Sequence, residues 1–235
     1  LETEADGNVD GGGNTGWYFG ENRYRCWING SGNWNDPSHW STYSGGPSGA
    51  APPLSANGVY FDVYFDLNSF TEGGQEVTLS AGVCKSMTWQ NALYLPTLIF
   101  STGSANETLT VYGDITFKSG MYIDYYSSIN LPMFINNISE DGIDPSIIIA
   151  GDCHLTNATI PLPPMRVNEN ITLTLEDDFV GSTLYVKGNL DAQEHDITVK
   201  AIKICPETSL YNIRVTSEEY IRIDSNGNIR ISILG

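Results

Sequence analysis

The chain has 235 residues and carries 28 acidic against 11 basic side chains, which gives a formal net charge of −17 at pH 7. Its length, with 40% hydrophobic residues, is enough for one sizeable domain or two small ones. The negative charge repels phosphate backbones and anionic lipid surfaces, so we expect no nucleic-acid partner. Asn, Ser, Thr, Gly and Tyr abound while only 17% of the residues are charged, a composition typical of an exported β protein.

Residues 1–20 are rich in Gly and Asn, and we expect them to be a linker or the end of a preceding module. Asp6, Asn8 and Asp10 have the spacing of the first three oxygen ligands of a calcium loop, and Gly11 has the place of its invariant glycine. Trp17 stands where that loop needs a bidentate glutamate. The sequence therefore leaves open both a calcium site and a flexible acidic linker.

Residues 21–58 place large aromatic side chains among turn-forming residues. Trp34 and Trp40 are six positions apart and are surrounded by Gly, Asn, Asp and Pro. A stack of strands exposes the apolar end of its first unit, so we expect this segment to be an N-terminal cap that covers that end. The alternative is that Trp34, Trp40 or the pair Tyr125-Tyr126 forms an exposed platform on which sugars stack.

Residues 59–235 are a succession of short β-branched and aromatic runs, and none of them has the apolar spacing of an amphipathic helix. We therefore predict an all-β protein. A sandwich closed by hairpins and a solenoid of stacked coils both fit such a pattern. Asn-Gly pairs at Asn57 and Asn226 would suit hairpins, but ordinary residues separate most of the strands.

An internal recurrence favours the solenoid. The run TLTVYGDI from Thr108 to Ile115 returns 75 residues later as TLYVKGNL from Thr183 to Leu190. This interval equals roughly three coils of about 25 residues. Chance similarity between two ordinary β sequences is the alternative.

The recurrence also predicts which side chains face inward. Gly113 and Gly188 would occupy equivalent corners, where glycine tolerates a positive φ. Strand alternation then divides the first run into two faces. We expect Leu109, Val111, Ile115 and Phe117 to point inward, with Thr108, Thr110, Tyr112 and Thr116 outward.

The cysteines and the sequons have structural interpretations. Zinc sites need much closer cysteine spacing, and disulfides or small buried strand residues both remain possible. The Asn-x-Ser/Thr sequons are expected by chance in a chain rich in Asn and Thr. The cysteines are Cys26, Cys84, Cys153 and Cys205, and the sequons begin at Asn29, Asn106, Asn137, Asn157 and Asn170.

We expect no catalytic site, and the sequence assigns no ligand-binding or metal residue. His39, His154 and His195 lie far apart, and no nucleophile motif accompanies them. The densest acidic run, Glu176-Asp177-Asp178, could supply paired carboxylates for glycoside hydrolysis. Adjacent residues on a strand alternate faces, so a solvated turn is the simpler interpretation. No stretch approaches about 18 consecutive apolar residues, which argues against membrane insertion.

The run CWINGSGNWNDPSHWS and several shorter motifs, which together cover about residues 11 to 117, resemble a module that is repeated in very large secreted surface proteins of Bacteroidetes. The strongest is this run, from Cys26 to Ser41. The others are Gly13 to Trp17, Ser44 to Pro47, Val59 to Asp62, Asn68 to Phe70, Gly74 to Thr78, Cys84 to Trp89 and Pro96 to Leu98.

This resemblance implies a right-handed parallel β-helix in an adhesin-like protein of gliding or gut bacteria, exported by type IX secretion to the outer face of the outer membrane. It implies no enzyme, no cofactor and no catalytic residue. Its partners would be surface glycans or other cell-surface and secretion-machinery proteins. A carbohydrate-binding module and a polysaccharide-degrading β-helix enzyme are the alternatives.

Overall fold

The computed structural model describes residues 23–53, 60–100, 108–125, 146–204, 209–211, 221–223 and 229–231. The regular secondary structure of these residues is β-strand, apart from a single 3₁₀ turn, Pro37–His39. Asp36 begins that turn by accepting a hydrogen bond from the Ser38 N–H at 2.9 Å. The predicted all-β class is confirmed.

The described strands form three sheets. The first contains, in spatial order, β19 (Ser209–Tyr211), β17 (Asn189–Asp191), β15 (Thr172–Leu175), β13 (Cys153–Thr156), β10 (Ile115–Thr116), β7 (Met87–Thr88), β4 (Asp62–Tyr64), β1 (Tyr24–Trp27) and β3 (Trp40–Ser41). The second contains β11 (Tyr122–Tyr125), β8 (Thr97–Phe100), β5 (Glu76–Leu79) and β2 (Gly32–Asn33). The third contains β20 (Ile221–Ile223), β21 (Ile229–Ile231), β18 (Ile197–Ile204), β16 (Phe179–Val186), β14 (Met165–Val167), β12 (Ile147–Ile149), β9 (Leu109–Val111) and β6 (Gly82–Cys84).

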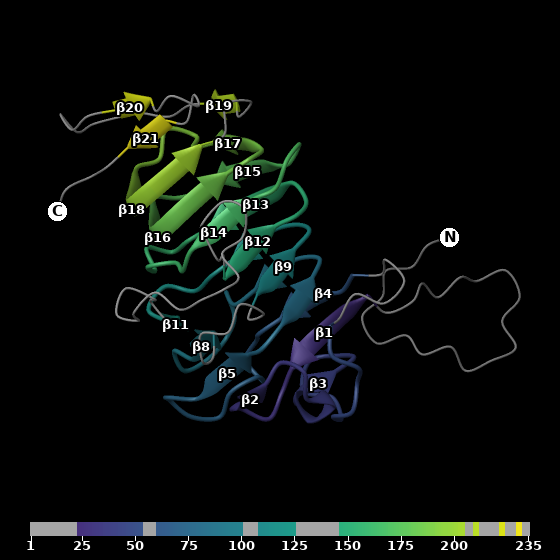
Figure 1. The fold of residues 1–235 in the computed structure, drawn as a ribbon. Helices are drawn as coiled ribbons and strands as arrows, with labels where there is room; N and C mark the ends of the chain where they lie inside the picture. The colour runs from purple at the N-terminus through teal and green to yellow at the C-terminus, as the bar shows by residue number, and fades with distance from the viewer. Residues whose placement is uncertain are drawn as a thin grey trace, which may run out of the picture.

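The chain moves from sheet to sheet. From β5 to β19, each time it returns to a sheet, its new strand pairs with its previous strand in that sheet. From β4 to β12 it visits the first, second and third sheets in turn, and from β12 to β19 it alternates between the third and the first. The pairings within this span are parallel. Figure 1 shows the strands following one another from β1, β2 and β3 at one end to β18 near the other.

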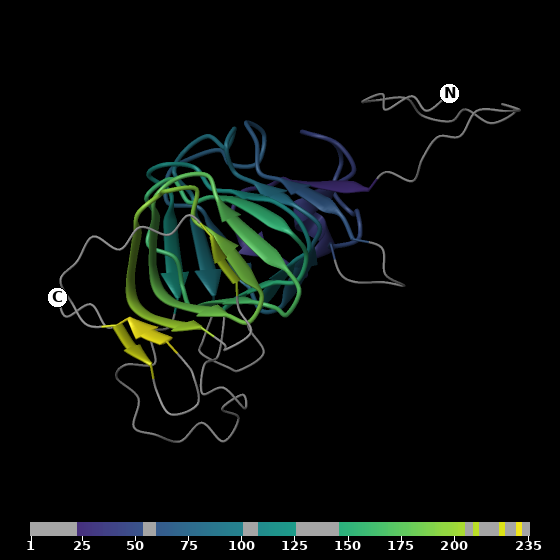
Figure 2. The same ribbon diagram turned by 90° about the horizontal axis from the view of Figure 1, so that it is seen from above.

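Strand alternation places the hydrophobic core between the sheets. Leu109, Val111, Ile115 and Phe117 are buried, whereas Thr108, Thr110, Tyr112 and Thr116 are half-buried, as predicted. One cluster of buried apolar side chains extends from Trp27 to Ile202. Figure 2 shows the strands of the three sheets facing this shared interior.

The tryptophans of the N-terminal segment belong to this core. Trp27, Trp34 and Trp40 are all 0% exposed. The ring of Trp40 meets Trp27 and Trp34 edge-on, with centroids 5.0 Å apart in both pairs. The indole N–H of Trp40 donates to the Trp34 carbonyl oxygen at 2.6 Å, and that of Trp27 donates to the Gly30 carbonyl oxygen at 2.7 Å. The predicted burial of Trp34 and Trp40 is confirmed, and these two rings present no face on which a sugar could stack.

The pairing confirms that Gly113 and Gly188 are equivalent in position. In the third sheet Leu109 pairs with Ile147, Ile147 with Met165, and Met165 with Leu184. Gly113 lies four residues after Leu109, and Gly188 lies four residues after Leu184. Both are in a turn that leads from the third sheet to the first. The two glycines are therefore three pairings apart, as the recurrence predicted.

The expected reason for these glycines was wrong, because neither has a positive φ. The reason is close packing instead: a Cβ on Gly113 would lie 2.7 Å from the Ser86 side-chain oxygen, whereas Gly188 and Gly151 lie against backbone. A Cβ on Gly188 would lie 2.2 Å from the Ile171 carbonyl oxygen, and one on Gly151, at the same corner after β12, would lie 2.1 Å from the Tyr112 carbonyl oxygen. Adjacent turns pack so closely at this corner that a side chain does not fit.

Candidate functional site

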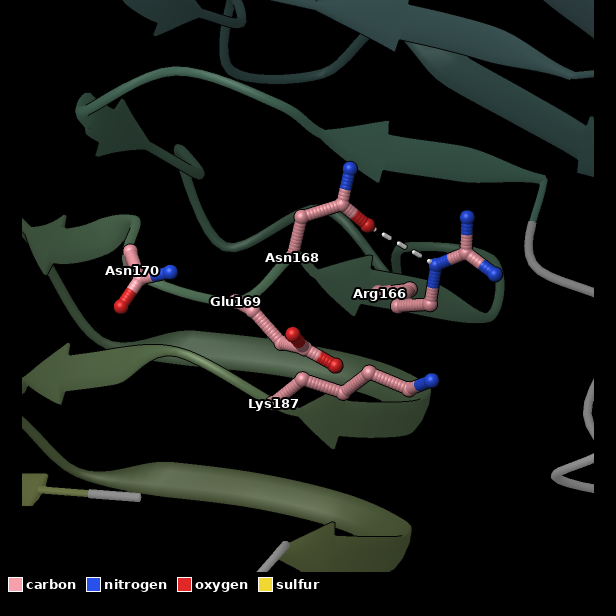
Figure 3. A pocket seen from close by; sticks show the side chains of 5 residues that line it. All are labelled: Arg166, Asn168, Glu169, Asn170 and Lys187. Carbon is pink, nitrogen blue, oxygen red and sulfur yellow. Dashed lines mark hydrogen bonds between the residues drawn. The ribbon is translucent and has the colours of Figure 1, made fainter. Parts of the chain in front are cut away.

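The structure places a pocket of about 450 Å³ at the corner between the third and the first sheet. Arg166 comes from β14, Asn168, Glu169 and Asn170 form the turn that follows it, and Lys187 comes directly after β16. All five lining side chains are polar or charged (Figure 3). The pocket is a shallow surface depression that is open to solvent.

Strand alternation positions the two cations. Met165 and Val167 point into the core and are 0% exposed, so Arg166 between them points outward. Arg166 is opposite Tyr185 in the parallel pair β14–β16. The Lys187 N–H donates to the Val167 carbonyl oxygen at 2.9 Å and continues this ladder by one residue. Neighbouring strands thus bring a guanidinium and an ammonium group to the same pocket.

The turn after β14 supplies the amide and carboxylate groups. The Asn168 N–H donates to the Ile149 carbonyl oxygen at 3.0 Å, which ties the turn to β12. Asn170 has a φ of 61°, in the left-handed region that asparagine tolerates better than most residues. The turn passes directly over Gly188, whose missing side chain leaves room for the Asn168 and Ile171 carbonyl groups.

Hydrogen bonding orients the polar groups of the pocket. The Arg166 Nε donates to Asn168 Oδ1 at 3.1 Å, and because arginine only donates, the Asn168 Nδ2 is left as a donor. Lys187 Nζ lies 5.5 Å from the centroid of the Tyr185 ring. The terminal nitrogens of Arg166 have no acceptor among the described residues. The pocket can therefore bind oxygen atoms that carry negative charge, and Glu169 can accept a hydrogen bond within it.

Sequence reasoning missed this pocket. Arg166 and Lys187 stand in the runs MRVNEN and YVKGNL, which share no obvious motif. The sequence could have indicated the pocket only through an alignment of the two strands. When Val167 is aligned with Val186, Arg166 and Lys187 fall near the same corner. Such an alignment needs the register of β14, a short strand that follows a proline-rich turn and does not belong to the recurrence.

The three histidines have separate local roles. His39 stacks on Trp27 with centroids 4.9 Å apart and an interplanar angle of 13°. His195 Nδ1 lies 3.5 Å from Asp178 Oδ1, and His154 Nδ1 lies 2.5 Å from Glu176 Oε1. His39 Nδ1 also lies 3.2 Å from the Ile28 carbonyl oxygen. The carboxylate partners of His154 and His195 were not predicted.

The three side chains of the acidic run Glu176-Asp177-Asp178 have different partners, Glu176 on strand β13 and the two aspartates on neighbouring turns. Asp177 accepts hydrogen bonds from the backbone N–H groups of Asn157 and Ala158, both at 2.6 Å. Asp178 accepts one from the Asp196 N–H at 3.0 Å. The run forms the turn between β15 and β16, as expected, but two of its carboxylates are engaged in binding backbone N–H groups of neighbouring turns.

The pair His154–Glu176 predicts a pH-dependent contribution to stability. The hydrogen bond to Glu176, with the nearby charges of Asp114 and Asp152, raises the pKa of His154. A raised folded-state pKa stabilises the protein below the pKa of the unfolded histidine, about 6.5, and this contribution is lost as pH rises through the folded pKa.

We therefore expect His154→Gln to lower the free energy of unfolding by about 0.5 kcal/mol at pH 5 and by less at pH 9. The value is small because the two side chains are 61% and 47% exposed, and solvent screens the pair. Urea unfolding at the two pH values measures the effect, with Glu176→Gln as the companion variant that keeps the histidine and removes the carboxylate. An equal loss at both pH values would show that the pair contributes no charge interaction.

The described cysteines are buried thiols. Cys26, Cys84 and Cys153 form no disulfide with one another, and Cys205 lies outside the described residues. Burial raises the pKa of the Cys84 thiol far above its usual value and raises that of Cys153 to about 12. Both thiols are thus protonated at neutral pH, which makes them small apolar core residues.

Other predicted residues fall in different places. Asp6, Asn8, Asp10 and Tyr126 lie outside the described residues, and Tyr125 packs partly buried against the core. Asn157, which begins one sequon, is 0% exposed. Within the described ranges no three His, Cys, Asp or Glu side chains are placed to hold a metal ion. No helix in the same ranges has the length and apolar character to cross a membrane.

Comparison of the chain with protein-family models, with curated proteins and with solved structures finds no match.

Proposed function

We propose that the chain is a right-handed parallel β-helix that serves as a structural and adhesive module of an exported bacterial surface protein. One observation carries this proposal, the uninterrupted parallel register of the third sheet from β6 to β18. Each of its steps pairs strands in parallel and places a buried position beside another. The series runs through Gly82, Leu109, Ile147, Met165, Leu184 and Ile202.

Physical reasons support each part of the fold proposal. From β4 to β19 the chain returns repeatedly to the same sheets and pairs in parallel each time, which is the connectivity of stacked coils, and parallel crossovers are almost always right-handed. Stacked units need a covered end. A Cβ on Gly82, in the terminal strand β6, would lie 3.2 Å from Trp34 Cε2, so the Trp34 ring packs against that end. We therefore propose residues 21–58 as the cap and residues 59–235 as the coils.

The functional part of the proposal follows from rigidity and composition. A continuous core with nearest-neighbour contacts gives a stiff body whose turns are free to vary. The acidic surface keeps such a body soluble and away from nucleic acids. The likeness of Cys26 to Ser41 to a module of Bacteroidetes surface proteins supports export by type IX secretion and a place on the outer face of the outer membrane. We propose surface glycans as partners and no catalytic activity.

Adhesion of coated beads tests this function. Beads that carry the folded chain should adhere to mucin or polysaccharide surfaces more than beads that carry albumin, because the chain is proposed to bind surface glycans. Heat-unfolded chain at the same density should lose this adhesion. Adhesion no stronger than that of albumin would contradict the proposal. Release of reducing ends from pectin, alginate or chitin that disappears in Asp178→Asn would favour the enzyme alternative instead.

A further inference from the structure

We propose that the pocket at Arg166 and Lys187 binds a sugar that carries a carboxylate, such as a uronate residue. The inference rests on the proposed adhesive function, because it names the chemical class of glycan that the surface recognises. Its physical basis is the pocket alone: two cations, two amides and one carboxylate around about 450 Å³.

Unused hydrogen-bonding capacity marks the pocket as a binding site. Within the part of the chain that the structure describes, the terminal nitrogens of Arg166, the Asn168 Nδ2 and the side chains of Glu169 and Asn170 have no protein partner. Arg166 and Asn168 are nevertheless half-buried, and the bond between them fixes their orientation. Groups held in place by a neighbour lose less conformational freedom when a ligand binds.

The guanidinium selects for a planar anion. Arg166 uses Nε to bind Asn168, so its two terminal nitrogens form a fork that matches both oxygens of a carboxylate. Figure 3 shows these two nitrogens pointing away from Asn168. The Lys187 ammonium adds a second positive charge at the same site. Among the described lining residues the two cations outnumber the one carboxylate, whereas the whole chain has a net charge of −17.

Glu169 decides between a simple anion and an acidic sugar. An ionised carboxylate only accepts hydrogen bonds, so Glu169 would repel a bare phosphate or sulfate ion. It would bind a ligand that also carries hydroxyl donors. Asn168 and Asn170 add amides that can bond to hydroxyl groups. None of the described lining residues has an apolar side chain, which disfavours a peptide with apolar residues and favours a ligand covered by hydroxyl and carboxylate groups.

Calorimetric titration with trigalacturonic acid, and with maltotriose as the neutral counterpart, tests the inference at physiological salt. A short probe is used because the acidic surface outside the pocket would repel a long polyanion. We expect the acid to bind and maltotriose not to bind. Arg166→Gln should weaken binding about tenfold or more, and Arg166→Lys should weaken it less, because it keeps the charge and loses the fork.

Lys85→Gln is the matched control, since Lys85 is an exposed cation that lies 3.7 Å from Asp62 and outside the pocket. It should bind trigalacturonic acid as the unmodified chain does, and all variants should unfold at similar urea concentrations. Equal affinity for both sugars, or unchanged binding by a folded Arg166→Gln, would overturn the inference. Bead adhesion without trigalacturonate binding would overturn this inference and leave the adhesive function standing. Trigalacturonate binding without bead adhesion would support this inference and contradict the adhesive function.

Discussion

Replacing Trp34 with alanine is expected to lower the free energy of unfolding by about 3–5 kcal/mol, the usual cost of removing a large buried aromatic side chain. Trp34 is 0% exposed, and its ring lies 5.0 Å from Trp40 and 6.2 Å from Phe65, centroid to centroid. The substitution would leave a cavity next to Gly82 at the end of the third sheet. Chemical unfolding followed by circular dichroism measures the loss.

Two further variants make this prediction decisive. Tyr43→Ala removes an aromatic ring that is 52% exposed in the same segment, and it should change the stability by no more than about 0.5 kcal/mol. Trp34→Phe keeps part of the ring and should give an intermediate loss if the alanine variant does not fold. If Trp34→Ala left the unfolding midpoint unchanged and abolished sugar binding, the tryptophans would form a sugar platform and not a cap.

Gly151→Ala is expected to cost roughly 2–3 kcal/mol although it adds only one methyl group. The new Cβ would lie 2.1 Å from the Tyr112 carbonyl oxygen and 2.7 Å from the Tyr112 carbonyl carbon. Both are backbone atoms, so the strain cannot be relieved by rotating a side chain, and the two turns must move apart. Urea unfolding of the variant measures this cost.

Gly73→Ala is the matched control. Gly73 has nothing within 4 Å of the position of a Cβ, and its φ is not positive. The same substitution there should be neutral or slightly stabilising, because alanine restricts the unfolded chain. If both variants lost the same stability, the close packing of the corner at Gly151 would be refuted.

The sequence predicted the features that depend on strand periodicity. The alternation in Leu109, Thr110 and Val111 separates buried from outward-facing side chains, whatever the partner strands are. The recurrence around Gly113 and Gly188 located two equivalent corners of the third sheet. These predictions require no knowledge of which distant residues are neighbours.

The recurrence also contains a shift of two residues that the sequence did not reveal. Its two copies align Ile115 with Leu190. In the first sheet, however, Ile115 pairs with Leu155 and Leu155 with Leu175, whereas Leu190 pairs with Leu173. A shift of two residues keeps the same side of a strand facing inward, so both residues stay buried and the pattern gives no sign of the change.

The candidate site could not be predicted because its residues meet only through the pairing register. Arg166 and Lys187 meet because β14 pairs with β16, and His154 meets Glu176 because β13 pairs with β15. Polar residues on outward-facing positions are common in β proteins. Their chemistry is recognisable only when the strand order shows which of them share a corner.

The distance between nitroxide labels at positions 64 and 176 tests the parallel stacking most directly. Tyr64 pairs with Thr88, Thr88 with Thr116 and Thr116 with Thr156, and the pair Leu155–Leu175 places Glu176 opposite Thr156. Labels attached through Tyr64→Cys and Glu176→Cys, in a chain with Cys205→Ser, should lie about 19 Å apart, four strand spacings, when measured by pulsed electron paramagnetic resonance. A mean distance beyond six spacings, about 29 Å, would contradict the stacked-coil account.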